Sequence, residues 1–253
     1  MTTQFGYGNV RVATATRTGT AAPSGDAVAV HVQTDGTTAA AVVDGIGHSN
    51  RVASVAELLA TVMARVAARR GSLAGLLTGT ELVADKGAGN EPEPDAVAVV
   101  ATVTASATAS CSTSGSTSAS AEEERIRVAW VGDCRAYALE GGRLRPLTAD
   151  HNLAEHLALC GYTGEIPRQA AKWVRTTVRS AAVATVSEAW TRSPLVVLMS
   201  DGVHDQVPHG AMEALALRYE DDPQALSEAL VAAAATGADG VRDDATTLVI
   251  RRG

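Results

Sequence analysis

Residues 39–47 read AAAVVDGIG, and residues 195–203 repeat the arrangement as LVVLMSDGV. In each, a run of small and branched apolar residues typical of a buried strand ends at an Asp-Gly pair. Two further segments place an aspartate at or near the start of a similar run: DAVAVHV at 26–32 and VRDDATTLVI at 241–250. If these strands lie side by side, their acids meet at strand ends, where carboxylates repel one another unless cations separate them. The acids concerned are Asp26, Asp44, Asp201 and Asp243.

The residue types at these strand ends favour a hard divalent cation. A glycine after the aspartate has no Cβ, so it allows a backbone carbonyl or a ligand to approach closely. Oxygen donors without a nearby cysteine or a histidine pair at ligand spacing select Mg²⁺ or Mn²⁺ over Zn²⁺ or Cu²⁺. Two such ions about 3.5–4 Å apart can deprotonate a bridging water and hold a phosphate oxygen. Any single Asp-Gly pair is also typical of a turn, and only their joint occurrence indicates a metal site.

Composition limits the class of protein. The chain has 253 residues, 46% of them hydrophobic, which is enough for one compact domain over residues 1–253. A net charge of -7 and an aromatic content of 3% offer neither a basic surface nor a stacking platform for nucleic acid. The three cysteines form no CxxC pair, which argues against a disulfide framework and a zinc knuckle. The N-terminus lacks a signal-peptide pattern and no stretch is long enough to span a membrane, so we expect a cytoplasmic protein.

Hydrophobic periodicity predicts strands paired as hairpins, and helices in neighbouring pairs. Strands are expected at 10–16, 26–33, 38–43, 95–103, 125–131, 132–139, 143–147, 195–199 and 245–251. Helices are expected at 50–70, 72–84, 152–159, 211–219 and 223–235, capped by Ser49 or Asn50, Asp150 and Asp222 where a cap is evident. Residues 104–124 are a Ser, Thr, Ala and Gly tract, interpreted as a loop or, alternatively, as a regulatory phosphorylation tract. Residues 162–192 give no clear pattern and could form a flap over the site. The absence of regular strand-helix alternation favours an α/β protein of the α+β type, with two antiparallel sheets covered by helices.

Six motifs in order resemble the bacterial metal-dependent protein phosphatases of the PP2C or PPM family. They are GDAVAV, AVVDGIGHS, VAWVGDCRAYAL, LTADHNL, LVVLMSDGV and RDDATTLVI, between about residues 20 and 252. The resemblance implies a sandwich of two antiparallel β-sheets flanked by paired helices. It also implies two Mn²⁺ or Mg²⁺ ions, with a third more weakly bound, a phosphoprotein substrate and a cognate serine/threonine kinase as a partner.

The resemblance assigns roles to individual positions. Asp44 would bridge two ions and the Gly45 carbonyl would bind one of them. Asp201 and Asp243 would hold the other ion. Asp26 would act through bound waters, and Asp133 matches the acid associated with the third ion.

Several positions depart from the family pattern. The family has an arginine five residues before the first aspartate to grip the substrate phosphate, and this chain has Ala21 there. Arg17, nine residues upstream of Asp26, is the candidate replacement. His48 lies one place earlier than the family histidine, where it could protonate the leaving alkoxide or simply open the following helix. Asp244 replaces an asparagine and would add negative charge beside the metals.

The sequence therefore predicts a metal-dependent phosphatase that hydrolyses phosphoserine or phosphothreonine by in-line attack of metal-activated water. The first alternative is a weakly active or inactive module of the same fold that binds a phosphoprotein or another partner, because the phosphate-gripping arginine is missing. The second alternative is a metal-dependent hydrolase of another phosphoester.

Overall fold

The structure is a computed structural model of the whole chain that describes residues 2–7, 9–83, 94–104, 125–236 and 240–253. Its strands are β1 (Thr2–Tyr7), β2 (Val10–Arg17), β3 (Asp26–Val32), β4 (Thr38–Gly45), β5 (Ala96–Val103), β6 (Ile126–Val131), β7 (Arg135–Glu140), β8 (Arg143–Pro146), β9 (Ser187–Thr191), β10 (Leu195–Met199) and β11 (Ala245–Arg252). Its helices are α1 (Asn50–Arg70), α2 (Ser72–Val83), α4 (Leu153–Leu159), η1 (Arg168–Lys172), α5 (Asp201–His204), α6 (His209–Arg218) and α7 (Pro223–Ala233).

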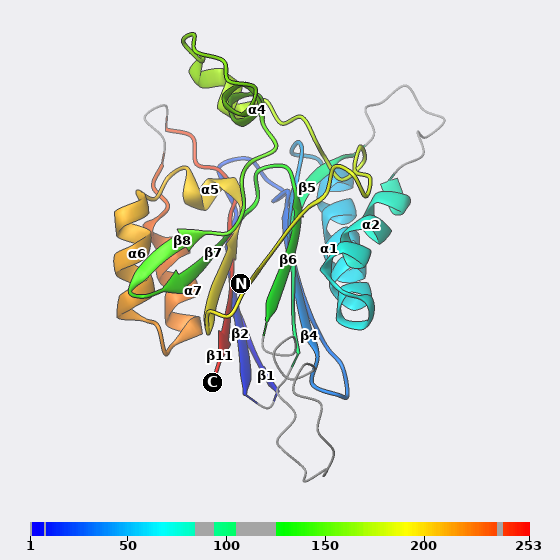
Figure 1. Cartoon of the computed structure of the whole chain (residues 1–253), viewed down its shortest axis with the longest axis vertical. Coiled ribbons are helices and arrows are strands. Elements are labelled where there is room, and N and C mark those ends of the chain that lie inside the picture. Colours follow the sequence, from blue (N-terminus) through cyan, green and yellow to red (C-terminus); the bar gives the residue numbers. More distant parts are fainter. Residues whose placement is uncertain (1, 8, 84–93, 105–124, 237–239) are drawn as a thin grey trace.

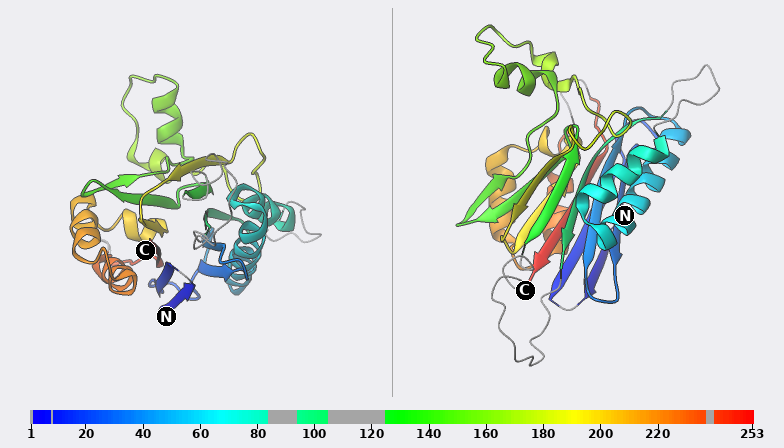
Figure 2. Two further views of the ribbon diagram at one scale, coloured as in Figure 1. Left: turned by 60° about the horizontal axis from the view of Figure 1, so that its bottom comes forward. Right: turned by 45° about the vertical axis from the view of Figure 1, so that its right-hand side comes forward.

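Two antiparallel sheets form the centre of the molecule. One has the strand order β1-β2-β11-β10-β7-β8 and the other has the order β3-β4-β5-β6-β9. Helices α1 and α2 cover the outer face of the five-stranded sheet, and α6 and α7 cover the outer face of the six-stranded sheet (Figures 1 and 2). The predicted class, two antiparallel sheets flanked by paired helices, is confirmed.

The alternation of side chains along the strands explains the four layers. In β4, Ala40 and Val42 point to the other sheet and join a buried cluster with Leu248 and Ile250 of β11. The intervening residues of β4 face the helices instead, in a second cluster with Leu59 and Met63 of α1: they are Ala39, Ala41 and Val43. A third cluster lies between the six-stranded sheet and α6 and α7. Both faces of each central strand are therefore buried, which is why these strands read as unbroken apolar runs.

Helix capping follows the sequence at two of the three positions where it was predicted. The Ser49 hydroxyl accepts from the Val52 amide at the start of α1, and the Asp222 carboxylate accepts from the Ala225 amide ahead of Pro223 in α7. The prediction that Asp150 caps the helix at 152–159 is wrong. Asn152 caps α4 by accepting from the Glu155 amide, while Asp150 is engaged by an arginine.

Several parts of the chain differ from the sequence prediction or lie outside the described residues. The strands β1 and β9 and the short helices η1 and α5 were not predicted, and β7 begins at Arg135 instead of residue 132. The tract 104–124 lies, apart from Thr104, outside the described residues. Among the described helices, none combines the length and the apolar character that crossing a membrane requires.

Candidate metal centre

Asp26 and Asp44 are brought together by the β3–β4 hairpin. They are direct cross-strand partners in the register of the two strands. Two carboxylates placed opposite each other destabilise a sheet unless something neutralises them. The buried Asp26 carboxylate accepts a hydrogen bond from the Ser200 hydroxyl, at 2.7 Å. This bond ties the end of β3 to the strand end of β10 in the other sheet.

Three more aspartates reach this pair. The pKa of Asp44 is raised well above its ordinary value, first by burial and then by the charges of Asp26, Asp201, Asp133 and Asp243. Burial, together with the neighbouring Asp201 and Asp150, raises the pKa of Asp133 to about 6. The pKa of Asp26 is raised to about 7, chiefly by burial, although hydrogen bonds from Ser200 and Thr246 act in the opposite direction. The five predicted acids therefore form one electrostatically coupled cluster, to which both sheets contribute.

Lys172 lies at the same cluster, although no motif predicted it there. Its ammonium is 2.8 Å from the Asp201 carboxylate and 2.6 Å from the Asp205 carboxylate. Partial burial alone would lower the pKa of Lys172, but the two carboxylates raise it above its ordinary value. Lys172 ends η1, so part of the unpredicted segment 162–192 does reach the site.

Two side chains, those of Lys172 and His204, lie beside the Asp205 carboxylate. His204 Nδ1 lies 3.0 Å from Asp205, and His204 Nε2 lies 2.9 Å from the backbone carbonyl of Asp133. Burial would raise the pKa of Asp205, but the bonds from His204 and Lys172 lower it well below its usual range. Asp205 is therefore an anionic partner for Lys172, and His204 connects α5 to the loop that carries Asp133.

Asp244 has a structural role that the sequence did not predict. Its carboxylate accepts from the backbone amides of Gly19 and Gly25, at 2.6 and 2.7 Å. These bonds fix the loop between β2 and β3 and so position Asp26. The negative charge that the sequence predicts for Asp244 beside the metals stays a prediction; after burial, this charge contributes to the raised pKa of Asp26 and of Asp243.

The glycines of the Asp-Gly pairs allow backbones to approach. A Cβ on Gly202 would lie 1.9 Å from the Asp244 carbonyl oxygen. A Cβ on Gly45 would lie 2.6 Å from Val52 Cγ1 and 2.9 Å from the Gly25 carbonyl oxygen. The absence of a side chain therefore brings the acid-bearing strand ends together.

The motif around Asp150 supports the Asp133 loop. Arg135 donates from Nε and Nη2 to the two Asp150 oxygens, at 2.8 and 2.7 Å. The backbone amide of His151 donates to the Gly132 carbonyl at 2.8 Å, and burial lowers the pKa of the His151 imidazole. Asp150 and His151 therefore support the loop that carries Asp133 and do not cap α4.

Two predicted residues lie apart from the acids. Arg17 Nη2 donates to the Ala234 carbonyl at the end of α7, which directs the guanidinium toward that helix. His48 is exposed in the bend between β4 and α1, one residue before the Ser49 cap. In this arrangement the Arg17 guanidinium is directed toward α7, and His48 is exposed four residues after Asp44 in the chain.

The donor chemistry of the cluster fits a hard divalent cation. All five side chains offer carboxylate oxygens, and Gly45 offers a backbone carbonyl beside Asp44. Within the ranges that the structure describes, no group of three or more His, Cys, Asp or Glu side chains is already placed to hold a metal ion. The cation at Asp201 is instead Lys172. Burial and neighbouring carboxylates raise the pKa of Asp44, and this crowding of acids is the observation that fits a divalent ion between them.

The fold matches that of solved PP2C-type phosphatases. The S. agalactiae serine/threonine phosphatase superposes with a TM-score of 0.77 at 16% identity, covering 96% of this chain and 100% of that one. PppA, a regulatory component of the type VI secretion system of Pseudomonas aeruginosa, gives a TM-score of 0.72 at 21% identity over 99% and 100% of the two chains. The catalytic domain of the phosphatase PstP in complex with two manganese ions gives 0.64 at 18% identity over 96% and 97%.

The family is shown by sequence. Residues 34–253 match the family described as Stage II sporulation protein E (SpoIIE), and the chain belongs to this family. No curated protein matches the chain by sequence. The resemblance to bacterial PP2C or PPM phosphatases, predicted from six motifs, is confirmed for the fold.

Proposed function

We propose that this protein is a Mn²⁺- or Mg²⁺-dependent phosphatase that hydrolyses phosphoserine or phosphothreonine in a cytoplasmic phosphoprotein substrate. The observation that carries the proposal is the coupling of Asp44 to four other aspartates drawn from both sheets. Clustered carboxylates repel one another, so a folded protein that brings five of them together is expected to bind cations between them. The neighbours in fold, which include a phosphatase with two bound manganese ions, support the same reading.

The acids would hold the ions, and other residues of the chain would orient the acids. Asp44, Gly45, Asp201 and Asp243 would bind two ions, Asp133 a third, and Asp26 would contact them through water. When bound, two ions supply a deprotonated water and neutralise the charge of the phosphate. Ser200 holds Asp26 in place, so the carboxylate is pre-oriented before an ion or a substrate arrives.

The remaining roles concern the leaving group and the phosphate. His48, which is exposed, would protonate the leaving alkoxide of serine or threonine. Arg17 could grip the phosphate only after leaving the Ala234 carbonyl. Lys172 already has its ammonium at Asp201 and is the better placed cation for a phosphate oxygen once an ion occupies Asp201.

The test is the variant Asp201→Asn, which keeps the shape of the side chain and removes its charge. We expect Mn²⁺-stimulated hydrolysis of p-nitrophenyl phosphate to fall about 100-fold or more, with weaker Mn²⁺ binding by calorimetry. Asp221→Asn is the matched control, because Asp221 is a highly exposed acid paired with Arg251 on another part of the surface. Equal activity of the two variants would contradict the assignment of Asp201 as a ligand.

One observation favours a second candidate function, a non-catalytic module that binds a phosphoprotein. Ala21 occupies the position of the phosphate-gripping arginine, and Arg17 is bonded to Ala234. A protein that binds Mn²⁺ but hydrolyses neither p-nitrophenyl phosphate nor phosphopeptides would favour this function over the first. Hydrolysis of small phosphoesters without any hydrolysis of phosphopeptides would instead indicate another phosphoesterase.

A further inference from the structure

The strand β3 has a free backbone edge. It ends the order of the five-stranded sheet and pairs with β4 on one side. At one end of the pair the Gly45 amide donates to the Gly25 carbonyl, and at the other end the Gln33 amide donates to the Thr37 carbonyl. Because hydrogen-bonded pairs alternate in an antiparallel ladder, the odd-numbered residues between these ends face β4. The even-numbered residues Val28, Val30 and Val32 therefore direct their N–H and C=O groups away from β4.

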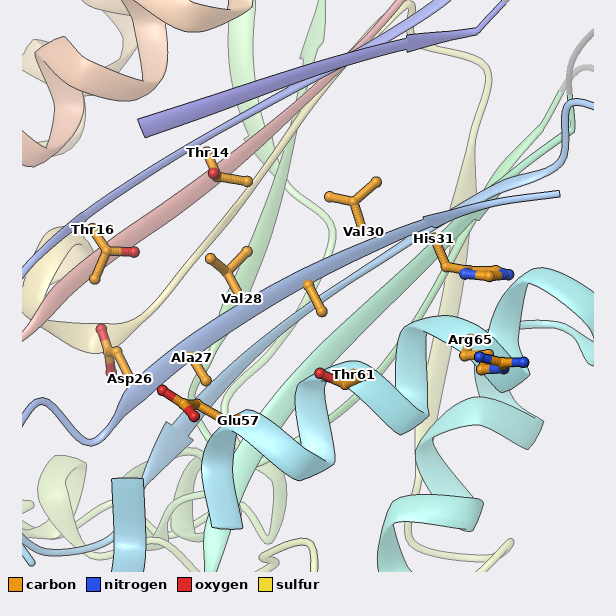
Figure 3. Close-up of a pocket in the computed structure, with 11 residues that line it drawn as sticks. Thr14, Thr16, Asp26, Ala27, Val28, Val30, His31, Glu57, Thr61 and Arg65 are labelled. Atoms are coloured by element: carbon orange, nitrogen blue, oxygen red, sulfur yellow. The ribbon is translucent and has the colours of Figure 1, made fainter. Parts of the chain in front are cut away.

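A groove of about 580 Å³ runs beside this edge. Glu57, Thr61 and Arg65 of α1 line one wall, and Thr14 and Thr16 of β2 line the other. Figure 3 shows Asp26 at one end of the groove and His31 at the other, with Val28 and Val30 between them. We call this feature the β3 groove; one member of the acid cluster, Asp26, lines its end.

The α1 wall carries opposite charges at its two ends. Glu57 lies near Asp26, whereas Arg65 lies near His31 (Figure 3). Burial, followed by the charges of Arg65 and Arg69, lowers the pKa of His31, so the His31 end of the groove has a positive electrostatic potential. Glu57 and Arg65 are separated by two helical steps of four residues, which places them about 12 Å apart along α1.

The spacing of these charges matches an extended chain. A strand rises about 3.3 Å per residue, so about 12 Å corresponds to four residues. Side chains four residues apart in a strand point to the same face. One extended peptide can therefore place a side chain beside Glu57 and the side chain four residues along beside Arg65.

We propose that the β3 groove binds an extended segment of the phosphoprotein substrate as an added strand on β3. The peptide would present a basic side chain to Glu57 and an acidic side chain, four residues further from the phosphorylated residue, to Arg65. Its phosphorylated residue would then lie at the Asp26 end, where the acid cluster begins. Backbone bonds to Val28 and Val30 supply affinity, and the two charges supply sequence preference. The inference rests on the proposed phosphatase function and names the substrate feature that it selects.

The first test uses charge-swapped partners. One set of phosphoserine peptides carries Lys near the phosphoserine and Glu four residues further away, and a second set carries the same two residues exchanged. Each set is made with the two charged residues on the N-terminal side of the phosphoserine and again with them on the C-terminal side. We expect the wild-type protein to prefer the first arrangement about tenfold in kcat/KM and in binding by fluorescence anisotropy, in one chain direction at least. The double variant Glu57→Lys with Arg65→Glu should reverse the preference. Arg70→Glu, on the same helix but outside this groove, is the matched control and should leave the preference unchanged.

The second test removes a backbone donor at the free edge. Val30→Pro deletes an N–H that faces away from β4, and Val30→Ala keeps it while shortening the side chain. We expect phosphopeptide kcat/KM to fall about fivefold to tenfold in the proline variant relative to the alanine variant. If the proline variant does not fold, the charge-swap experiment alone decides.

The two hypotheses fail in different ways. p-Nitrophenyl phosphate has no peptide backbone and no charged side chain, so its hydrolysis reports on the acid cluster and not on the β3 edge or the two charges of α1. If it is hydrolysed while the charge-swapped peptides are treated alike, the β3 groove does not bind substrate and the inference is overturned. If it is not hydrolysed, the phosphatase function fails, and anisotropy with the same peptides still accepts or rejects the groove.

Discussion

Lys172→Met removes the only ammonium seen at the acid cluster in the described structure and keeps an unbranched side chain in its place. In the metal-free protein, Asp201 and Asp205 then lose the cation that lies 2.8 and 2.6 Å from them. When a divalent ion binds Asp201, the same cation must give way. The substitution is therefore expected to lower the stability of the metal-free protein and to raise its affinity for the metal.

The magnitude follows from the exposure of the lysine. Its side chain is 58% exposed, so solvent screens both ion pairs, and each contributes about 0.5–1 kcal/mol. The free energy of unfolding of the metal-free variant should fall by about 1–2 kcal/mol, which lowers Tm by about 2–8 °C in a domain of this size. Because the ion no longer competes with the ammonium, Mn²⁺ affinity should rise about fivefold to thirtyfold.

Thermal unfolding in a chelator and titration calorimetry with Mn²⁺ measure the two effects. Lys172→Arg keeps the charge and serves as the control, with both quantities close to the wild type. A Met variant with unchanged Tm and unchanged Mn²⁺ affinity would refute the reasoning, because it would mean that Lys172 does not neutralise Asp201 in solution.

Two further outcomes are expected. Burial raises the pKa of Asp26 to about 7 and that of Asp133 to about 6, so protonation of either group stabilises the folded state. The Tm of the metal-free protein should therefore fall as pH rises from 5 to 8, and saturating Mn²⁺ should make this fall less steep. A Tm of the metal-free protein that rises over this range would contradict the assignment. Gly202→Ala places a Cβ 1.9 Å from the Asp244 carbonyl oxygen and should cost about 3 kcal/mol or more in denaturant unfolding, whereas Gly210→Ala, with open space at its Cβ in α6, should change stability by no more than about 1 kcal/mol.

The fold could be predicted because its pattern is local. Apolar runs such as 195–199 and the helical periodicity of 50–70 appear in the sequence with nearly their final bounds. β1 and β9 were missed because they are edge strands, whose pairing with β2 and β6 decides the conformation.

The acids of the site could be predicted from their position at the ends of apolar strands, but their partners could not. Lys172 lies 29 residues before Asp201 in a segment without clear periodicity, and nothing local indicates that its ammonium reaches that carboxylate. The motif position of Asp244 predicted a negative charge beside the ions, but it did not predict the hydrogen bonds that this carboxylate makes. Its actual contacts, with Gly19 and Gly25, join residues more than 200 positions apart and depend on the packing of the two sheets.

The sequence by itself determined the secondary structure of the central strands, the oxygen-only character of the donor set and the order of the motifs, because each depends on residue type and near spacing. The tertiary structure decided which charges face one another. Asp26 lies opposite Asp44 through strand register, Ser200 reaches Asp26 from the other sheet, and the edge of β3 lies open beside α1. Coulombic and hydrogen-bond energies fall off over a few ångströms, so these contacts exist only after distant strands have packed.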